Sequence, residues 1–406
     1  MRISRHGEKF VLLVGDGMAD YPLQELGGKT PLEVAHTPNM DRIAACRVGL
    51  AKTIPDGMSP GSDVANLSLL GYDPSQYHTG RAPFEAASMG VDLAPDDVAF
   101  RMNLVTLDRR SDEKIIMVSH SSGDLTTEAA IPLVDTLKAE LSTSLIQIHT
   151  GVAYRHLLVW KDGPEEAATI PPHDVLDQNM APYLNGRGDP VVSMIRRSWP
   201  CLADHPVNQD RLKAGLKAAN SIWPWGQGRA LQLPSFRDRF GLEGGGISAV
   251  DLLRGIGVYA GLTPIEVEGA TGYLDTNFSG KAEEALRALD RLDFVFVHVE
   301  APDEASHSGN IKDKIAAIEA FDAKVVGAVL KGLERFEAYR VMVASDHFTP
   351  IVIKTHTDEP TPFAWATKKE LARRDGRARF TEAFASASGL FLERGYDVMP
   401  IFLGRA

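Results

Sequence analysis

The sequence has little of several features that define special classes of protein. It contains 2 cysteines, Cys46 and Cys201, and neither has a second cysteine or a histidine at zinc-finger spacing nearby, so we expect buried or inert thiols in a reducing compartment. The apolar run Phe10–Val14 is too short for a signal-peptide core, and no run approaches the roughly 20 residues that span a bilayer. We therefore expect a cytoplasmic protein that has no membrane partner.

Positive charge is scarce as well. The chain has 43 Lys and Arg against 54 Asp and Glu, a formal net charge of −11 at pH 7, and no Lys- or Arg-rich run. This balance disfavours electrostatic binding to nucleic acid or to an anionic membrane. Any anionic ligand must therefore be held by a local cluster of cations or by metal ions.

The rest of the composition is that of an ordinary globular protein: 406 residues, 44% hydrophobic and 24% charged, enough for roughly two or three domains. Continuous apolar runs at Phe10–Val14, Phe294–Val299 and Tyr339–Ala344 are typical of strands buried on both faces of a parallel sheet. Amphipathic helices are predicted at Gly280–Leu292 and Ile311–Phe336. Strands that alternate with helices predict the α/β class, with a doubly wound, mostly parallel sheet.

The middle of the chain has a different pattern. From Val98 to Gly241, short or alternating strands surround one predicted helix near Thr126–Leu141 and a Pro/Trp-rich stretch. We interpret this part as a second α/β domain inserted into the first. The predicted division is a discontinuous core domain of residues 1–96 and 242–406 and an inserted domain of residues 97–241, with hinges near Leu93–Asp96 and Leu242–Gly246.

Two glycine-containing motifs are not expected to carry chemistry. Gly57–Gly61 matches the nucleophile elbow of serine hydrolases, but the residue after Ser59 is Pro60, which lacks the N–H group that the oxyanion hole needs. Gly244–Ala249 matches a loose dinucleotide-binding fingerprint, but no strand is predicted before it. We interpret its glycines as part of a flexible hinge.

Aspartate and histidine recur just after the predicted strands. Ligands of open α/β sheets bind outside the carboxyl ends of the strands, so side chains at these positions can converge although they are far apart in sequence. The last of them follows Ile351–Lys354, which we predict as a short strand. Three carboxylates and three imidazoles form a candidate two-metal set: Asp16, Asp303, His307, Asp346, His347 and His356.

Local spacing supports the metal hypothesis. Pro302 suits the first turn of a helix, in which Asp303 and His307 would lie at i and i+4 on one face and could grip one ion. Oxygen and imidazole ligands without thiolate suit Mn²⁺, Zn²⁺, Mg²⁺ or Co²⁺. Taken singly, each aspartate could be a helix cap or turn residue, and each histidine an ordinary hydrogen-bonding side chain.

Ser62 is the candidate nucleophile. It follows Pro60 and Gly61 and opens a predicted helix to about Leu70, so its hydroxyl would lie at a helix N-terminus, where an anion is favoured. By itself it would be an N-cap serine. Beside two metal ions its pKa would fall, and it could accept a phosphoryl group. Phosphate-monoester cleavage can require accelerations of up to ~10²¹-fold, whereas one proton-transfer group typically supplies ~10²–10⁴-fold. A two-metal site therefore accounts for this reaction better than a single acid or base does.

Six segments together resemble the archaeal-type cofactor-independent phosphoglycerate mutases, a branch of the alkaline phosphatase superfamily. The segments follow in order over nearly the whole chain, at residues 14–20, 61–74, 79–85, 298–307, 345–347 and 354–362. Their sequences are VGDGMAD, GSDVANLSLLGYDP, TGRAPFE, HVEAPDEASH, SDH and KTHTDEPTP.

The resemblance implies a phosphatase-like core and an inserted domain that closes over the site. It also implies two divalent metal ions, Mn²⁺ or Zn²⁺ before Mg²⁺ or Co²⁺, and no use of 2,3-bisphosphoglycerate or a nucleotide. One ion would be held by Asp303, His307 and His356, and the other by Asp16, Ser62, Asp346 and His347. Ser62 would be transiently phosphorylated while 3-phosphoglycerate and 2-phosphoglycerate interconvert, a step of glycolysis and gluconeogenesis.

Substrate anchors are expected in segments that resemble the family or that offer a cation: His120, Arg155, Arg254 and Lys281. Each cation among them could instead be a solvated surface charge. Besides a non-catalytic binding protein, two enzymatic alternatives stay open, a metal-dependent phosphatase and a mutase for another small phosphorylated metabolite. Such relatives would share the core and differ in the inserted domain.

Overall fold

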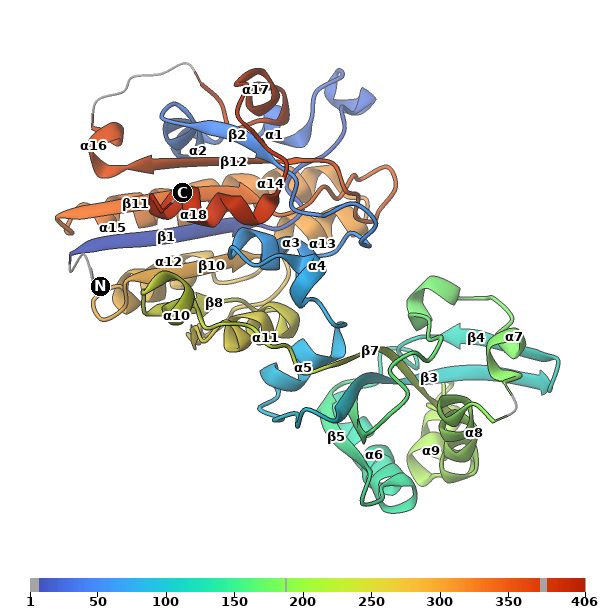
Figure 1. The fold of residues 1–406 in the computed structure, drawn as a ribbon. Helices are drawn as coiled ribbons and strands as arrows, with labels where there is room; N and C mark the ends of the chain where they lie inside the picture. The colour runs from blue at the N-terminus through green and yellow to red at the C-terminus, as the bar shows by residue number, and fades with distance from the viewer. Residues whose placement is uncertain (1–6, 187, 373–377, 406) are drawn as a thin grey trace. The chain divides into compact units, whose positions relative to one another are not determined.

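The computed structural model describes residues 7–186, 188–372 and 378–405 and is drawn in Figure 1. The described chain divides into two compact units. The larger unit runs up to His78 and resumes at Gln232, and the smaller unit is Thr79–Leu231. The boundaries that the sequence predicted, 96/97 and 241/242, fall later in the chain than these two points.

The larger unit is built on an eight-stranded sheet in the order β13-β2-β12-β11-β1-β10-β8-β9. The central strand β1 pairs in parallel with β10 on one side and β11 on the other, and β8 continues the parallel part. Strand β12 runs antiparallel to its neighbours. The strands are β1 Glu8–Gly15, β2 Val48–Ala51, β8 Gly244–Ile247, β9 Thr263–Pro264, β10 Phe294–Val299, β11 Ala338–Ser345, β12 Thr361–Thr367 and β13 Phe391–Leu392.

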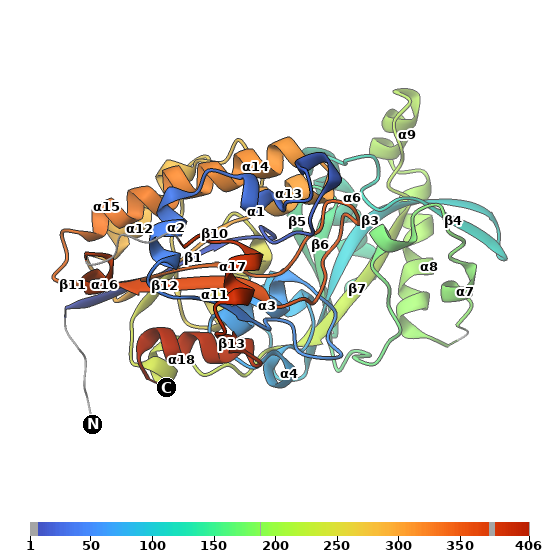
Figure 2. The same ribbon diagram turned by 90° about the horizontal axis from the view of Figure 1, so that it is seen from above.

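Helices cover both faces of this sheet, with α14 and α15 on one side and α3 and α18 on the other (Figure 2). A short π-helical stretch, Phe321–Val326, joins α14 to α15, so the helix predicted from Ile311 is nearly continuous. The helices are α1 Pro31–Val34, α2 Pro38–Ala44, α3 Ser62–Leu69, α4 Pro74–Tyr77, α10 Phe236–Phe240, α11 Asp251–Tyr259, α12 Phe278–Ala288, α13 Ala301–His307, α14 Ile311–Ala320, α15 Gly327–Leu333, α16 Lys368–Leu371, α17 Glu382–Ala387 and α18 Val398–Leu403.

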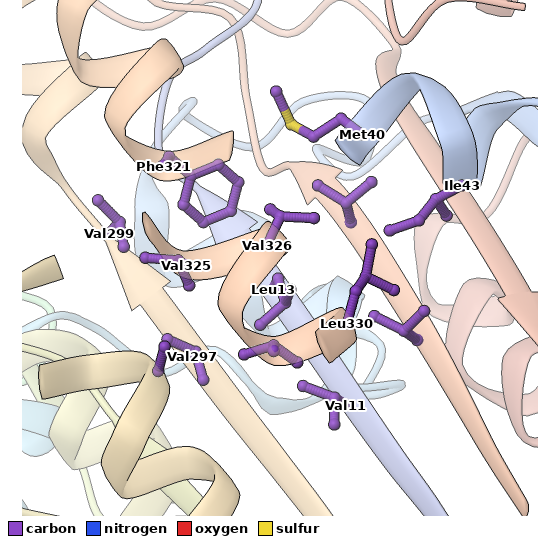
Figure 3. Packing of buried hydrophobic residues seen from close by; sticks show 14 of the residues in the cluster. Val11, Leu13, Met40, Ile43, Val297, Val299, Phe321, Val325, Val326 and Leu330 are labelled. Carbon is purple, nitrogen blue, oxygen red and sulfur yellow. The ribbon is translucent and has the colours of Figure 1, made fainter. Parts of the chain in front are cut away.

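The core of the larger unit lies between the sheet and the helices on one of its faces. Burying a Val, Leu, Ile, Phe or Met side chain completely is worth roughly 1.5–3 kcal/mol, so the apolar runs of β1, β10 and β11 are what fix these strands at the centre. Figure 3 shows part of this core, with side chains from the strands and from the covering helices: Val11, Leu13, Met40, Ile43, Val297, Val299, Phe321, Val325, Val326 and Leu330.

The smaller unit has its own antiparallel sheet, in the order β4-β3-β6-β5, with β7 paired to β3. Its elements are α5 Ala82–Ser88, β3 Asp97–Ser111, β4 Lys114–Ser119, α6 Thr127–Leu141, β5 Ile146–Val152, β6 Arg155–Lys161, α7 Ala181–Leu184, α8 Pro190–Ala203, α9 Pro206–Lys213 and β7 Ser221–Arg229. It also has its own hydrophobic core, which includes Phe100, Leu133 and Trp223. The predicted α/β class with a mostly parallel main sheet and a second α/β unit is confirmed.

Two local predictions are wrong. The glycines at 244–246 do not form a hinge but the buried strand β8. A Cβ at Gly244 would lie 2.5 Å from Cδ2 of Leu262, and one at Gly245 would lie 2.6 Å from Cδ1 of Ile265. Glycine is therefore required here because neighbouring side chains pack closely against the strand. Since glycine has no side chain, the sequence shows no apolar pattern at this strand. Residues 351–354 form a turn rather than a strand. Among the residues described, no helix is long and apolar enough to cross a membrane.

Candidate active site

Six side chains with metal-ligating atoms converge at the carboxyl ends of β1, β10 and β11. Asp16 follows β1, and Asp346 and His347 follow β11. Two groups of three have ligand atoms within 4.8 Å of one another, and His347 belongs to both: Asp16, Asp346 and His347, and Asp303, His347 and His356. The structure therefore brings together what the sequence predicted from strand ends.

Helix α13 supplies the remaining candidate ligand, His307, and places it beside Asp303 as the i, i+4 spacing predicted. Pro302 lies in its first turn, and Nε2 of His307 lies 3.0 Å from Oδ2 of Asp303. The same Nε2 atom lies 3.0 Å from Nε2 of His356. Asp303, His307 and His356 thus form one compact group, although His356 follows a turn and not a strand.

The carboxylates of this site are buried close together. Asp16 is 1% exposed, Asp303 4% and Asp346 0%. Burial raises the pKa of Asp16 well above its ordinary value, and the charges of Asp346 and Asp303 raise it further. Oδ1 of Asp16 is buried without a hydrogen-bond partner among the described residues. Buried like charges and an unpartnered oxygen are compensated by a bound cation, so the site fits divalent metal ions.

Hydrogen bonds within the protein determine which ring nitrogen of His307 and of His347 could bind a metal ion. Nδ1 of His307 lies 2.9 Å from the carbonyl oxygen of Lys354, and because a carbonyl only accepts, this nitrogen carries the proton. The hydroxyl of Thr349 donates to Oδ1 of Asp303 at 2.6 Å and so accepts from Nδ1 of His347 at 3.1 Å. Nε2 of His347 therefore keeps its lone pair for a metal ion, and Nε2 of His307, which faces Oδ2 of Asp303, is the nitrogen that a metal ion would bind in place of a proton.

The charge of Asp303 acts strongly on its neighbours. Burial disfavours a positive charge on His307, but the hydrogen bond and the charge of Asp303 outweigh it and raise the pKa of His307 to about 9. Burial also opposes ionisation of Asp303, yet hydrogen bonds from His307 and His356 hold the pKa of that carboxyl well below its ordinary value. An ionised carboxylate that faces two imidazoles is a ready cation site.

Ser62 lies at this cluster. It is the first residue of α3, is half-buried, and its Oγ lies 3.0 Å from Nε2 of His347. The amide of Asn66, one turn later, donates to the carbonyl oxygen of Ser62 at 2.9 Å and to Oδ2 of Asp346 at 2.8 Å. The helix that begins at the candidate nucleophile is therefore tied directly to a candidate metal-ligating carboxylate.

The four predicted substrate anchors are found in different surroundings. In the smaller unit, the ring of His120 lies 5.7 Å from that of Tyr154, and the neighbouring Arg155 is exposed. In the larger unit, Arg254 forms an ion pair with Glu266. Lys281 differs from the expectation, because its side chain is fully buried and its Nζ donates to the carbonyl oxygen of His298 at 2.9 Å. It has no exposed surface with which to bind a substrate.

Comparison with known proteins decides the family. A protein of Geobacter sulfurreducens named as a probable 2,3-bisphosphoglycerate-independent phosphoglycerate mutase is 48% identical over 98% of this chain and 100% of its own length. The mutase of that name from Methanosarcina barkeri is 49% identical over 97% of this chain and 99% of its own. The chain belongs to the 2,3-bisphosphoglycerate-independent phosphoglycerate mutase family. The model of that family matches residues 44–208, and the predicted resemblance is confirmed.

Solved structures agree with this assignment. A protein of Pyrococcus horikoshii has a TM-score of 0.81 at 31% identity and covers 98% of each chain. The cofactor-independent phosphoglycerate mutase of Thermoplasma acidophilum has a TM-score of 0.63 at 26% identity and covers 98% of this chain and 99% of its own. The fold of this mutase family member is thus found in solved structures over nearly its full length.

Sequence reasoning missed three residues that contact the candidate ligands: Asn66, His298 and Thr349. Asn66 and His298 left a signal, since the first lies one turn after Ser62 and the second is a histidine inside an otherwise apolar strand. Thr349 left none, because a threonine after a strand is common in turns and caps. Its contact with Asp303 depends on the tertiary structure.

Proposed function

We propose that this chain is a metal-dependent phosphoglycerate mutase that interconverts 3-phosphoglycerate and 2-phosphoglycerate through a phosphoserine at Ser62. The observation that carries the proposal is the placement of the Ser62 hydroxyl 3.0 Å from Nε2 of His347, within a cluster of buried carboxylates and imidazoles. Family membership supports the same substrate, because the relatives are named as mutases that do not need 2,3-bisphosphoglycerate.

Two divalent metal ions complete the proposed site. Mn²⁺ and Zn²⁺ are the preferred metals for both positions, ahead of Mg²⁺ and Co²⁺. When bound, they would lower the pKa of the serine hydroxyl and neutralise negative charge on the phosphoryl oxygens. Asp303, His307 and His356 would hold one ion. Asp16, Ser62, Asp346 and His347 would hold the other.

The chain's own residues account for the exchange as follows. Oγ of Ser62 forms a bond to phosphorus while the bond between phosphorus and the substrate oxygen breaks. The serine proton and the phosphoryl group change places, so that Ser62 becomes phosphoserine and the substrate oxygen becomes a hydroxyl. Glycerate then reorients without leaving, and its other hydroxyl takes the phosphoryl group back. The side-chain amide of Asn66, which donates to Ser62 and to Asp346, would hold these two residues in place relative to each other through both half-reactions.

The smaller unit has the proposed role of closing over bound substrate, with His120 and Arg155 as its anchors. Closure would exclude the water that otherwise hydrolyses a phosphoserine. Arg155 suits a bidentate grip on a carboxylate or phosphate. We propose the cytoplasm as the compartment, in keeping with Cys46 and Cys201, which are not joined in a disulfide.

The test is an assay of the purified, Mn²⁺-loaded chain with 3-phosphoglycerate and no added 2,3-bisphosphoglycerate. We expect 2-phosphoglycerate, a phosphorylated intermediate on Ser62, and loss of both in Ser62→Ala. Ser75→Ala alters an exposed serine close in sequence and should keep full activity. Release of inorganic phosphate without 2-phosphoglycerate would instead support a phosphatase, or a mutase for another phosphorylated metabolite.

A further inference from the structure

The carboxylate of Asp16 has two oxygens in different surroundings. Oδ2 lies 2.9 Å from Nε2 of His298. Oδ1 lies 3.2 Å from Nε2 of His347 and has no hydrogen-bond partner among the described residues. One oxygen is therefore held by the protein, and the other faces the ring that Ser62 also contacts.

His298 is placed for this contact by the sheet. It is fully buried on β10, and β10 pairs with β1 so that His298 lies opposite Val14. Asp16 lies just beyond that position, where β1 has ended. The pairing of β1 with β10 thus brings the imidazole of His298 and the carboxylate of Asp16 together.

The hydrogen bonds around His298 form a chain of donors that leads from Val250 through Ser248 and His298 to Asp16. A carboxylate that is ionised as a metal ligand only accepts, so with Asp16 in that role the proton of a neutral His298 ring lies on Nε2 and points to Asp16. Nδ1 is then an acceptor, and the hydroxyl of Ser248 lies 3.4 Å from it. Oγ of Ser248 in turn accepts from the N–H group of Val250 at 3.0 Å. The hydroxyl proton of Ser248 is therefore free to point to the ring.

The backbone behind the ring is held as well. Nζ of the fully buried Lys281 donates to the carbonyl oxygen of His298 at 2.9 Å. Lys281 therefore has a structural contact inside the core in place of the substrate contact that the sequence predicted. The imidazole is thus supported at its backbone by α12 and at its ring by Ser248.

Asp346, the other carboxylate of the group that contains Asp16 and His347, is held differently. Its Oδ1 accepts from the backbone N–H groups of Gly17 and His347, each at 3.0 Å, and its Oδ2 accepts from Asn66. Backbone amides hold Asp346 whatever the neighbouring side chains are. The orientation of Asp16 relies on a side chain, His298.

We propose that His298 is a positioning residue, which holds Oδ2 of Asp16 so that Oδ1 is left for the metal ion of the Asp16, Ser62, Asp346 and His347 group. Residues that orient metal ligands typically contribute about 10–100-fold to metal affinity. The inference rests on the metal centre of the proposed function. His298 makes no hydrogen bond to Asp303, His307 or His356 among the described residues. We therefore expect it to affect the affinity for only one ion, the one held by the group that contains Asp16.

The test is calorimetric titration of the metal-free full chain with Mn²⁺. The wild-type chain should bind two ions. His298→Leu, which has similar bulk and no donor, should weaken one binding event by about 10–100-fold and leave the other unchanged. His298→Gln retains an N–H donor at a similar distance from the backbone and should restore much of the lost affinity. Far-ultraviolet circular dichroism should be unchanged in both variants.

Ser248→Ala gives a second, milder test, because it removes the donor to Nδ1 without touching the ring. It should weaken the same binding event by a smaller factor than His298→Leu. The inference is overturned if His298→Leu binds both ions as the wild type does, if it loses both events equally, or if Gln restores nothing. A wild-type chain that binds no Mn²⁺ contradicts the proposed metal centre itself, and the two failures are therefore distinguishable.

Discussion

Nε2 of His307 lies 3.0 Å from Nε2 of His356. Nδ1 of His307 donates to the carbonyl oxygen of Lys354, so Nε2, which faces both Asp303 and His356, is the nitrogen that a metal ion would bind in place of a proton. Two ring nitrogens at this separation, with Oδ1 of Asp303 3.5 Å from His356, suit a cation that all three residues share. This relationship leads to the first prediction.

His356→Ala should remove one of the two Mn²⁺ binding events, with a larger loss than the ~10–100-fold typical of a residue that only orients a ligand. The other event should persist, because Asp16, Asp346 and His347 are unchanged. Metal content after gel filtration and calorimetric titration measure this. His36→Gln, which alters an exposed histidine, is the control and should bind both ions. Loss of both ions in His356→Ala would contradict two separable sites.

Thr349→Val should weaken both binding events, because one hydroxyl donates to Asp303 and accepts from His347, and these two residues hold different ions in the proposed site. Valine keeps the shape of the side chain and removes its hydrogen bonds. We expect roughly tenfold weaker binding at each site, measured by the same titration, together with lower kcat.

Thr361→Val is the matched control, since that buried hydroxyl makes a 3.4 Å bond to the carbonyl oxygen of Ala51 in the same sheet. If Thr349→Val binds both ions as tightly as Thr361→Val does, then Thr349 has no role in orienting the ligands.

Lys314 and Asp20 form a buried ion pair, with Nζ 2.8 Å from Oδ2 and both side chains fully buried. Lys314→Met leaves an uncompensated buried carboxylate and should lower the free energy of unfolding by about 3–5 kcal/mol. The double variant with Asp20→Asn should be less destabilised than Lys314→Met alone. Urea unfolding measures both.

Lys312→Met changes an exposed lysine on the same helix and should have little effect. Equal stability of Lys314→Met and Lys312→Met would show that the ion pair does not contribute.

Glu382 should make stability depend on pH. Burial raises the pKa of Glu382 from 4.5 to about 7, although hydrogen bonds from its own backbone, from Asp20 and from Thr30 favour its charge. The folded chain thus binds this proton more tightly than the unfolded chain, and the stabilisation is complete below pH 4.5 and is lost as pH rises through 7. That loss is at most about 3 kcal/mol.

Glu382→Gln should lose less stability than the wild type between pH 5 and pH 8, as measured by urea unfolding at each pH. Glu25→Gln, which changes an exposed carboxyl, should follow the wild type. A wild-type and a Glu382→Gln chain with the same pH dependence would contradict the raised pKa.

The sequence was sufficient where local pattern decides structure. The apolar run at Phe294–Val299 has the bounds of β10, and the helix predicted to open at Ser62 is α3. Strand ends also pointed to Asp16, Asp346 and His347 as candidate ligands, because the carboxyl ends of parallel strands share one edge of a sheet. His356 was predicted from a strand that the structure shows to be a turn. Strand β8 escaped prediction, since its glycines have no side chains from which an apolar pattern could be recognised.

By itself, then, the sequence determined which strands are buried, which residue types can bind metal, and, through six ordered motifs, which family the chain resembles. Only the tertiary structure decided the contacts that refine the site. Asp16 and His298 are 282 positions apart, and Thr349 joins Asp303 to His347 through a single hydroxyl. Such contacts follow from strand pairing and loop packing, which bring distant residues to within a hydrogen bond and leave no periodicity in the chain.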